Sequence, residues 1–308
     1  MSRIRTTVTT LVFAFVLIAS ASLSGCTGQV TLPEQLDKVQ GETAANVNDH
    51  VGAMKPSSTG GEWALIGLIK SGRPEAKARS EEYLKNLATK LQKNHGKLTD
   101  TKYGDYARAT IVLSLLGKDP RNFEGVDLVS PLDDYNIVSE QGVTVEAFAL
   151  IASKMAGVTL KNQQLYMDDI YEDVSNSAHF DDPVASDYLA MELQAVVVCG
   201  EAAPKDLKEM ILAKLRDLAK SNKAYDTSES VSQVIIALTE AGINPYKDEL
   251  YFQDGRSPAQ WLMSYYVGDG GFVHVKEEKE ENQFATESAL LALDSLKLME
   301  KGGRLYEK

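Results

Sequence analysis

Apolar and small side chains recur every three or four positions in five stretches of the chain, and each stretch ends at a glycine. This spacing places the apolar positions on one face of a helix. A glycine after the last apolar position is typical of a helix C-cap, because glycine adopts the left-handed backbone without strain. The glycines stand 40 to 45 residues apart, at Gly72, Gly117, Gly157, Gly200 and Gly242. The pattern therefore predicts a repeated helix, and a sixth copy that ends at Lys297 follows the longer insertion 244–283.

More polar amphipathic stretches lie between these helices. They predict a second set of helices at residues 81–94, 121–132, 161–174, 205–220 and 257–267. The last apolar helix has no such partner after it, so the amphipathic segment 32–54, either one helix or two helices broken at Gly41, is the expected partner. A helix-pair repeat of this length is typical of solenoids and closed rings. We expect an all-α fold, an (α/α)6 toroid of six inner and six outer helices in which the N-terminal helix closes the ring against the C-terminal one.

The N-terminus has the pattern of an export signal. Arg3 and Arg5 precede a short apolar run at 11–20, which is too short to span a bilayer as a stable helix. The run is followed by Leu23-Ser-Gly-Cys26, which resembles the lipobox of bacterial lipoproteins, where the cysteine is diacylated and becomes the mature N-terminus. This resemblance implies a signal peptide at 1–25, a lipidated tether at 26–33 and a toroid domain at 34–308, held at the extracytoplasmic face of a bacterial membrane through Cys26. An ordinary cleaved signal or a short anchor is the alternative.

The amino-acid composition favours a protein with a sizeable core and argues against nucleic acid as a partner. The 308 residues include 44% hydrophobic residues, ample for a core, and the formal net charge of −12 repels nucleic acid. With Cys26 lipidated, Cys199 is the only remaining thiol, so we expect no intramolecular disulfide. Cys199 falls in a column of small and apolar positions of the repeat, which indicates a packing role.

Two motifs near the C-terminus carry a family resemblance. The Asp269-Gly-Gly-Phe272 turn and the helix start Ala285-Thr-Glu-Ser-Ala-Leu290, set in the helix-pair repeat, resemble the terpenoid cyclase and protein prenyltransferase α/α toroid superfamily. The closest likeness is to the squalene-cyclase-like domains of bacterial surface proteins, and transcobalamin and intrinsic factor share the architecture. The resemblance covers about residues 60–300 and implies the toroid fold more safely than any activity.

In such a toroid the inner helices run parallel, so their first turns meet at one mouth of a central funnel. Acidic and aromatic side chains occupy these first turns and form the expected ligand-binding set: Glu62, Trp63, Asp105, Tyr106, Glu146, Phe148, Asp187, Tyr188, Glu229, Phe284 and Glu287. This mouth suits a sugar, a cationic or amphipathic ligand, or a peptide. The alternative is that the acids cap helix amides and stabilise the helix dipole, while the aromatics belong to the core.

An acidic run at 168–173 resembles the aspartate-rich motif with which class I terpene synthases hold a magnesium–diphosphate cluster. Carboxylates suit hard cations, so Asp168, Asp169 and Asp173 are the candidate metal ligands. The run falls in a predicted outer helix, and a solvated acidic face is the alternative. The Asp-x-Asp-Asp acid of class II cyclases does not occur in the sequence.

Zinc and other cofactors are not expected. Protein prenyltransferases hold zinc with an aspartate, a cysteine and a histidine, but Val197 stands two residues before Cys199 where their pattern has aspartate. The four histidines show no metal-ligand spacing, and they are His50, His95, His179 and His274.

Paired carboxylates leave glycoside hydrolysis open, because that chemistry needs one acid of raised pKa opposite a second carboxylate. Asp187 and Glu229, on adjacent repeats, are the candidate catalytic pair. We expect a lipid-anchored binding or interaction protein rather than a catalyst, with a small molecule, a glycan or a protein as ligand. The alternatives are an isoprenoid cyclase or prenyltransferase-like enzyme, and a carbohydrate-active hydrolase.

Overall fold

The computed structural model describes residues 31–176 and 182–308. The predicted signal peptide and Cys26 lie outside the described residues. Within them the chain is predominantly helical, which confirms the all-α class, and the two strands described are the short antiparallel pair β1 (Tyr266–Gly268) and β2 (Gly271–Phe272). None of the helices formed by residues 31–176 and 182–308 combines the length and apolar composition that a bilayer crossing requires.

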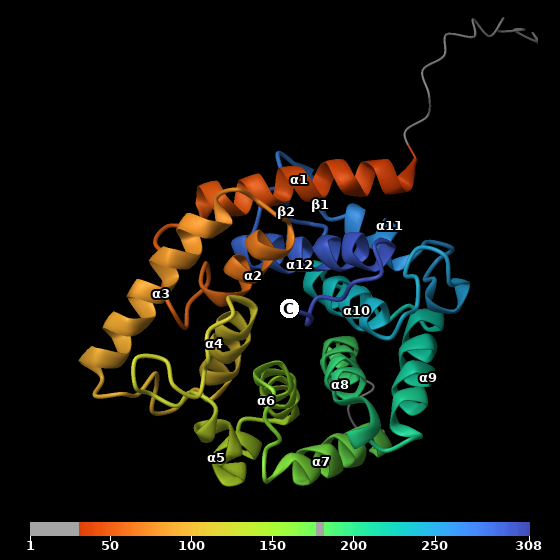
Figure 1. Ribbon diagram of the computed structural model, residues 1–308. Helices are drawn as coiled ribbons and strands as arrows, with labels where there is room; N and C mark the ends of the chain where they lie inside the picture. The colour runs from red at the N-terminus through yellow and green to blue at the C-terminus, as the bar shows by residue number, and fades with distance from the viewer. Residues whose placement is uncertain (1–30, 177–181) are drawn as a thin grey trace, which may run out of the picture. The chain divides into compact units, whose positions relative to one another are not determined.

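The unit Leu32–Lys308 contains two sets of helices that alternate along the chain (Figure 1). The predicted inner helices are α2 (Glu62–Lys70), α4 (Gly104–Leu115), α6 (Val143–Ala156), α8 (Ala185–Cys199), α10 (Ser228–Glu240) and α12 (Gln283–Glu300). The other set comprises α1 (Leu32–His50), α3 (Ala76–Lys93), α5 (Tyr135–Ser139), α7 (Gln163–Ser175), α9 (Leu207–Lys220) and α11 (Pro258–Met263).

The inner helices pack in a cycle. Each packs against the next one along the chain, and α12 packs against α2, while α1 lies along α12. Close approach of α12 and α2 depends on Gly67, because a Cβ at this position would lie 2.6 Å from Cδ2 of Leu290. The other helices pack against these inner helices, and buried apolar residues come in about equal numbers from the inner helices and from the rest of the described chain.

Neighbouring inner helices run in the same direction. The evidence is that polar contacts join the beginning of one helix to the beginning of the next: Gly60 N to Glu287 Oε1 at 2.8 Å, Arg108 Nε to Glu62 Oε2 at 3.7 Å, and Tyr103 N to Gln141 Oε1 at 2.9 Å. The first turns of these helices therefore lie at one end of the unit. We call this end the amino-terminal mouth.

The five glycines that the repeat predicts as helix ends all have positive φ, between 59° and 78°. After four of them the next amide donates to a carbonyl five residues back, as in a Schellman cap. These bonds are Arg73 N to Leu68 O, Lys118 N to Leu113 O, Val158 N to Ser153 O and Ile243 N to Leu238 O. These five predicted helix ends are confirmed, and glycine suits them because it takes a positive φ without strain. The sixth predicted end, at Lys297, is three residues too early, since α12 continues to Glu300.

Two predicted outer helices are wrong in whole or in part. Residues 121–132 form a turn, in which Phe123 pairs with Val126 across Glu124 and Gly125 at φ 52° and 79°, and then a short 3₁₀ helix. Residues 257–267 form a helix only to Met263, because the chain then enters the β1–β2 hairpin. The other three stretches form helices close to the predicted bounds.

The first segment is one helix and not two. A Cβ at Gly41 would meet no described atom within 4 Å, so this glycine serves no close approach. Val39, Ala44 and Val47 on either side are buried in the interface that α1 forms, and this packing outweighs the modest cost of a glycine within a helix.

Candidate functional site

The first turns of α2 and α4 form a closed network. Glu62 is 1% exposed and accepts hydrogen bonds from Ser57 N at 2.9 Å and from the Tyr83 hydroxyl at 2.9 Å. Arg108 lies 3.7 Å from Glu62 and also pairs with Asp105. Burial raises the pKa of Glu62, although the nearby Arg108 opposes this shift. Glu62 and Asp105 therefore have their partners within the protein.

Glu287 of α12 behaves in the same way. It is 2% exposed and accepts hydrogen bonds from Gly60 N at 2.8 Å and Gln283 Nε2 at 2.9 Å. Burial raises its pKa to about 7. This carboxyl fastens the entry of α2 to α12, which is a structural role.

The aromatic members of the predicted ligand set separate into two groups. Tyr106 is 4% exposed, with its hydroxyl between Leu98 N and Thr99 O, so it belongs to the core. Trp63 of α2 and Phe148 of α6 are partly buried and contact each other, with ring centroids 5.1 Å apart. Tyr188 is partly exposed and Phe284 is 51% exposed, so these two remain accessible at the mouth.

The beginnings of α8 and α10 are organised differently. Asp187 lies close enough to Ser230 and Glu229 of α10 to hydrogen-bond with the first and to interact electrostatically with the second. Its Oδ1 is shielded from solvent but has no hydrogen-bond partner among the described residues. Burial raises the pKa of Asp187 to about 6, against the opposing hydrogen bond from Ser230 and with a further contribution from the Glu229 charge.

Glu229 is held by a histidine that the sequence did not single out. His274 Nδ1 lies 2.9 Å from Glu229 Oε2, and the His274 carbonyl accepts a hydrogen bond from Ser228 N at 3.0 Å. The His274 side chain is 44% exposed. The structure thus brings together the two predicted catalytic candidates, Asp187 and Glu229, and adds an imidazole. The sequence offered little indication of His274, which is a lone histidine two residues after the Asp-Gly-Gly-Phe turn.

The acidic run of α7 lies on an outer helix. Asp169 accepts a hydrogen bond from the Tyr135 hydroxyl at 2.8 Å, and Asp168 accepts one from Gln164 at 2.9 Å. Asp169 also faces Glu146 of α6, whose pKa rises to about 8 because of burial and then of the bond to Asp169. Tyr135, Glu146, Asp169 and Asp173 line an open pocket of about 410 Å³, and Asp168 is not part of its lining. Across residues 31–176 and 182–308, no three histidine, cysteine or acidic side chains are placed to hold a metal ion.

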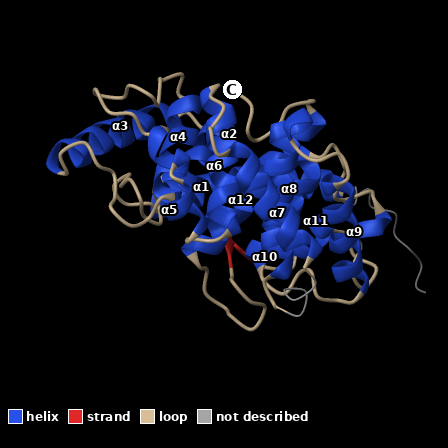
Figure 2. Cartoon of the chain, turned by 90° about the horizontal axis from the view of Figure 1, so that it is seen from below, coloured by secondary structure: helices blue, strands red, loops and turns tan. Residues whose placement is uncertain are grey.

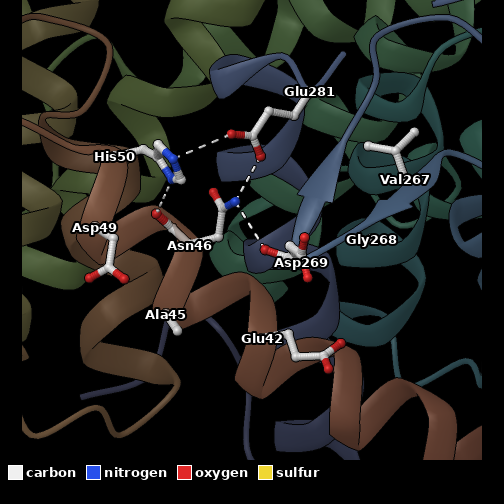
Figure 3. A pocket seen from close by; sticks show the side chains of 9 residues that line it. All are labelled: Glu42, Ala45, Asn46, Asp49, His50, Val267, Gly268, Asp269 and Glu281. Carbon is white, nitrogen blue, oxygen red and sulfur yellow. Dashed lines mark hydrogen bonds and ion pairs between the residues drawn. The ribbon is translucent and has the colours of Figure 1, made fainter. Parts of the chain in front are cut away.

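A further acidic pocket lies between the end of α1 and the β1–β2 hairpin (Figure 3). It has a volume of about 590 Å³ and its lining consists of Glu42, Ala45, Asn46, Asp49, His50, Val267, Gly268, Asp269 and Glu281. Asn46 Nδ2 donates to Glu281 Oε2 at 2.7 Å and to the Asp269 carbonyl at 3.1 Å, and His50 lies 3.6 Å from Glu281. These contacts hold the hairpin against α1, so we assign the residues that line this pocket a structural role.

Cys199 is 4% exposed at the end of α8, and burial raises the pKa of its thiol to about 11. The thiol is therefore protonated at neutral pH and poorly suited to act as a nucleophile or a metal ligand.

No protein-family model matches the chain, and no curated protein matches it significantly.

Proposed function

We propose that the chain is a lipid-anchored extracytoplasmic protein that binds a cationic or amphipathic ligand at the beginnings of α8 and α10. The observation that carries this proposal is the shielded Asp187 oxygen, which has no hydrogen-bond partner within the part of the chain that the structure describes, beside the Glu229–His274 pair. A ligand ammonium or hydroxyl group would supply the hydrogen-bond donor that this oxygen lacks. Tyr188 and Phe284, both accessible, would add apolar contact.

The proposed architecture is the (α/α)6 toroid. Its support is the cyclic packing of α2, α4, α6, α8, α10 and α12, together with α1 lying along α12. Removing residues 32–54 tests it, because the loss of α1 would expose the apolar face of α12 and lower the free energy of unfolding. An unchanged unfolding midpoint in urea would refute the role of α1 in closing the ring.

The proposed anchor is Cys26, supported by the lipobox-like Leu23-Ser-Gly-Cys26. Mass spectrometry of the membrane-extracted protein tests this assignment. We expect a diacylated N-terminal Cys26, and we expect Cys26→Ala to release the protein from the membrane fraction. An unmodified cysteine, or membrane retention of Cys26→Ala, would exclude the anchor while leaving the ligand site untouched.

Ligand binding is tested with the unit Leu32–Lys308 in a thermal-shift screen. The panel holds prenyl diphosphates with magnesium, corrinoids, oligosaccharides and peptidoglycan fragments. A ligand at a hundredfold excess over its dissociation constant adds about 2.7 kcal/mol to the free energy of unfolding. We expect Tyr188→Ala to weaken binding of any hit at least fivefold. Tyr171→Ala is the matched control, because Tyr171 is a 36%-exposed tyrosine on the outer helix α7.

A carbohydrate-active hydrolase at the same position is the second candidate function. The observation that favours it is the raised pKa of Asp187, about 6, next to the Glu229 carboxylate, which matches the acid and the second carboxylate that glycoside hydrolysis requires. This candidate predicts turnover of an oligosaccharide that binds. Asp187→Asn and Glu229→Gln should each abolish turnover without changing the unfolding midpoint by more than a few degrees. Binding without turnover would leave the non-catalytic proposal standing alone.

A further inference from the structure

The last residues of the chain lie against the end of the unit opposite the amino-terminal mouth. After α12 the backbone turns at Gly302, with φ 80°, and residues 303–308, which we call the C-terminal segment, run back to the ends of α2 and α10. Figure 1 shows the C-terminus surrounded by the inner helices, and Figure 2 shows it on the side away from β1 and β2.

Side chains at the helix ends hold the backbone of this segment. Glu240, the last residue of α10, is 7% exposed and accepts a hydrogen bond from Leu305 N at 2.7 Å, and the Tyr306 amide also donates to it. Lys70, the last residue of α2, donates to the carbonyl oxygens of Arg304, at 3.5 Å, and of Glu307. Donors and acceptors of the peptide backbone are thus both matched by side chains of the helices.

Two side chains of the segment are enclosed as well. Leu305 is 1% exposed and Tyr306 is 8% exposed. The Tyr306 hydroxyl donates to Oε1 of the fully buried Gln194 of α8 at 2.8 Å, and Gln194 is oriented in turn by donating to Gln233 at 2.9 Å. An aliphatic side chain, a tyrosine hydroxyl and the backbone between them are therefore contacted together. Peptide recognition by strand addition likewise combines main-chain hydrogen bonds with pockets for individual side chains.

The contacts that hold the segment are distinct from those that join the helices to one another. The helices that line it pack against one another through their own contacts. The segment is held by the enclosed Leu305 and Tyr306 side chains, by Arg304 Nε donating to the Glu240 carbonyl at 3.3 Å, and by the hydrogen bonds already described. Local opening of a peripheral segment needs less free energy than global unfolding. When the segment leaves the site, Gln194 and Glu240 lose hydrogen-bond partners. This loss favours occupation of the site by a peptide of the same chemistry.

We propose that the ends of α2, α8 and α10 form a peptide-binding site for an extended segment with a large aliphatic residue followed by tyrosine. The C-terminal segment occupies this site as an exchangeable internal ligand. The site is distinct from the amino-terminal mouth, so it does not depend on the function proposed there.

The probe is a fluorescent peptide with the sequence of residues 303–308, Gly-Arg-Leu-Tyr-Glu-Lys, added to the full chain. Fluorescence anisotropy should show at least tenfold tighter binding to the double variant Leu305→Ala/Tyr306→Ala than to the unaltered chain, because the weakened internal segment no longer competes. A peptide with alanine in place of the tyrosine should bind at least tenfold more weakly. Equal affinity of the two peptides, or no binding to the double variant, would overturn the proposal.

Substitutions in the site separate recognition from nonspecific adhesion. In the double variant, Gln194→Leu should reduce peptide affinity about tenfold, whereas Gln164→Leu on α7, the matched control, should leave it unchanged. Glu240→Gln should retain binding within about threefold, because the amide oxygen can still accept the backbone hydrogen bonds. A Gln194→Leu variant that is folded by circular dichroism and binds with unchanged affinity would contradict the site.

Hydrogen exchange of the unaltered chain provides the check that needs no substitution. The amides of Leu305 and Tyr306 should exchange at least a hundredfold faster than those in the centre of α10, and added peptide should accelerate them further. Equal protection of the two regions would mean that the segment is a permanent part of the fold, and the exchangeable-ligand proposal would fail.

Discussion

The two sides of the amino-terminal mouth carry the same types of residue and use them differently. At α2 and α4, Glu62 and Asp105 are buried and bound by Tyr83 and Arg108. At α8 and α10, Asp187 keeps an oxygen without a described partner, and Glu229 binds the half-exposed His274. An acidic residue in the first turn of a helix therefore does not indicate a function by itself. Its neighbours decide whether it fastens the fold or remains able to bind.

The largest expected change in stability is at α2 and α4, which we call the closed side of the mouth, in contrast to the open side at α8 and α10. Glu62→Ala would leave the Tyr83 hydroxyl, the Ser57 amide and Arg108 without their common partner in a buried position. Removing one member of a buried charged network is strongly destabilising, so we expect a loss of about 3 kcal/mol in the free energy of unfolding, measured by urea denaturation. A loss below about 1 kcal/mol would remove the distinction between the two sides.

Asp187→Asn, on the open side, is expected to raise the free energy of unfolding at neutral pH rather than lower it. The wild-type carboxyl has a pKa of about 6 in the folded protein against an ordinary value of 3.8, so it favours the folded state less as the pH rises between these values. The variant should therefore match the wild type below this range and exceed it in stability by about 1–2 kcal/mol at pH 7. Urea denaturation of both proteins across pH 4–8 measures this gap, and a gap that narrows with rising pH would contradict the environment assigned to Asp187.

The smallest effect on stability is expected for His274→Ala. Its side chain is 44% exposed, and exposed pairs contribute about 0–1 kcal/mol, so the free energy of unfolding should change by less than about 0.5 kcal/mol. Affinity for a ligand at the mouth should nevertheless fall at least fivefold, because Glu229 loses the group that orients it. Calorimetric titration with any ligand from the thermal-shift panel measures this difference. His95→Ala is the control, since His95 lies in the segment between α3 and α4 and its backbone amide bonds to Gln92 of α3.

The sequence predicted the helical class and the helix ends because both depend on local chemistry. A C-cap glycine with positive φ ends its helix through local backbone conformation, whatever the helix packs against. Residues 121–132 misled the prediction because their apolar residues have helix-like spacing and are buried, but in a turn followed by a short 3₁₀ helix. These residues are Phe123, Leu128, Val129 and Leu132. Asp127 supports that turn by accepting hydrogen bonds from Val129 N and Ser130 N.

The candidate site was predictable only in part. Asp187 and Glu229 could be paired because the repeat places them at equivalent positions of adjacent helices. The contact of His274 with Glu229 could not be predicted, because His274 lies in a loop 45 residues away and the repeat does not encode that contact. The docking of Leu305 and Tyr306 also depends on tertiary contacts, with Gln194 lying 112 residues before its tyrosine partner.

The cyclic packing has a consequence for the order of folding. Most contacts between successive repeats join residues about 40 positions apart, such as Ser186 with Ala224 at 38 and Gln194 with Gln233 at 39. The contacts of α12 with α2 and α1 join residues much farther apart, Gly60 with Glu287 at 227 and Gln40 with Asp294 at 254. Because closing a longer loop costs more chain entropy, the repeats should assemble stepwise and this seam should form last. The rate at which the seam closes would then set how long a newly made chain exposes its apolar inner face to proteases and to other copies of itself.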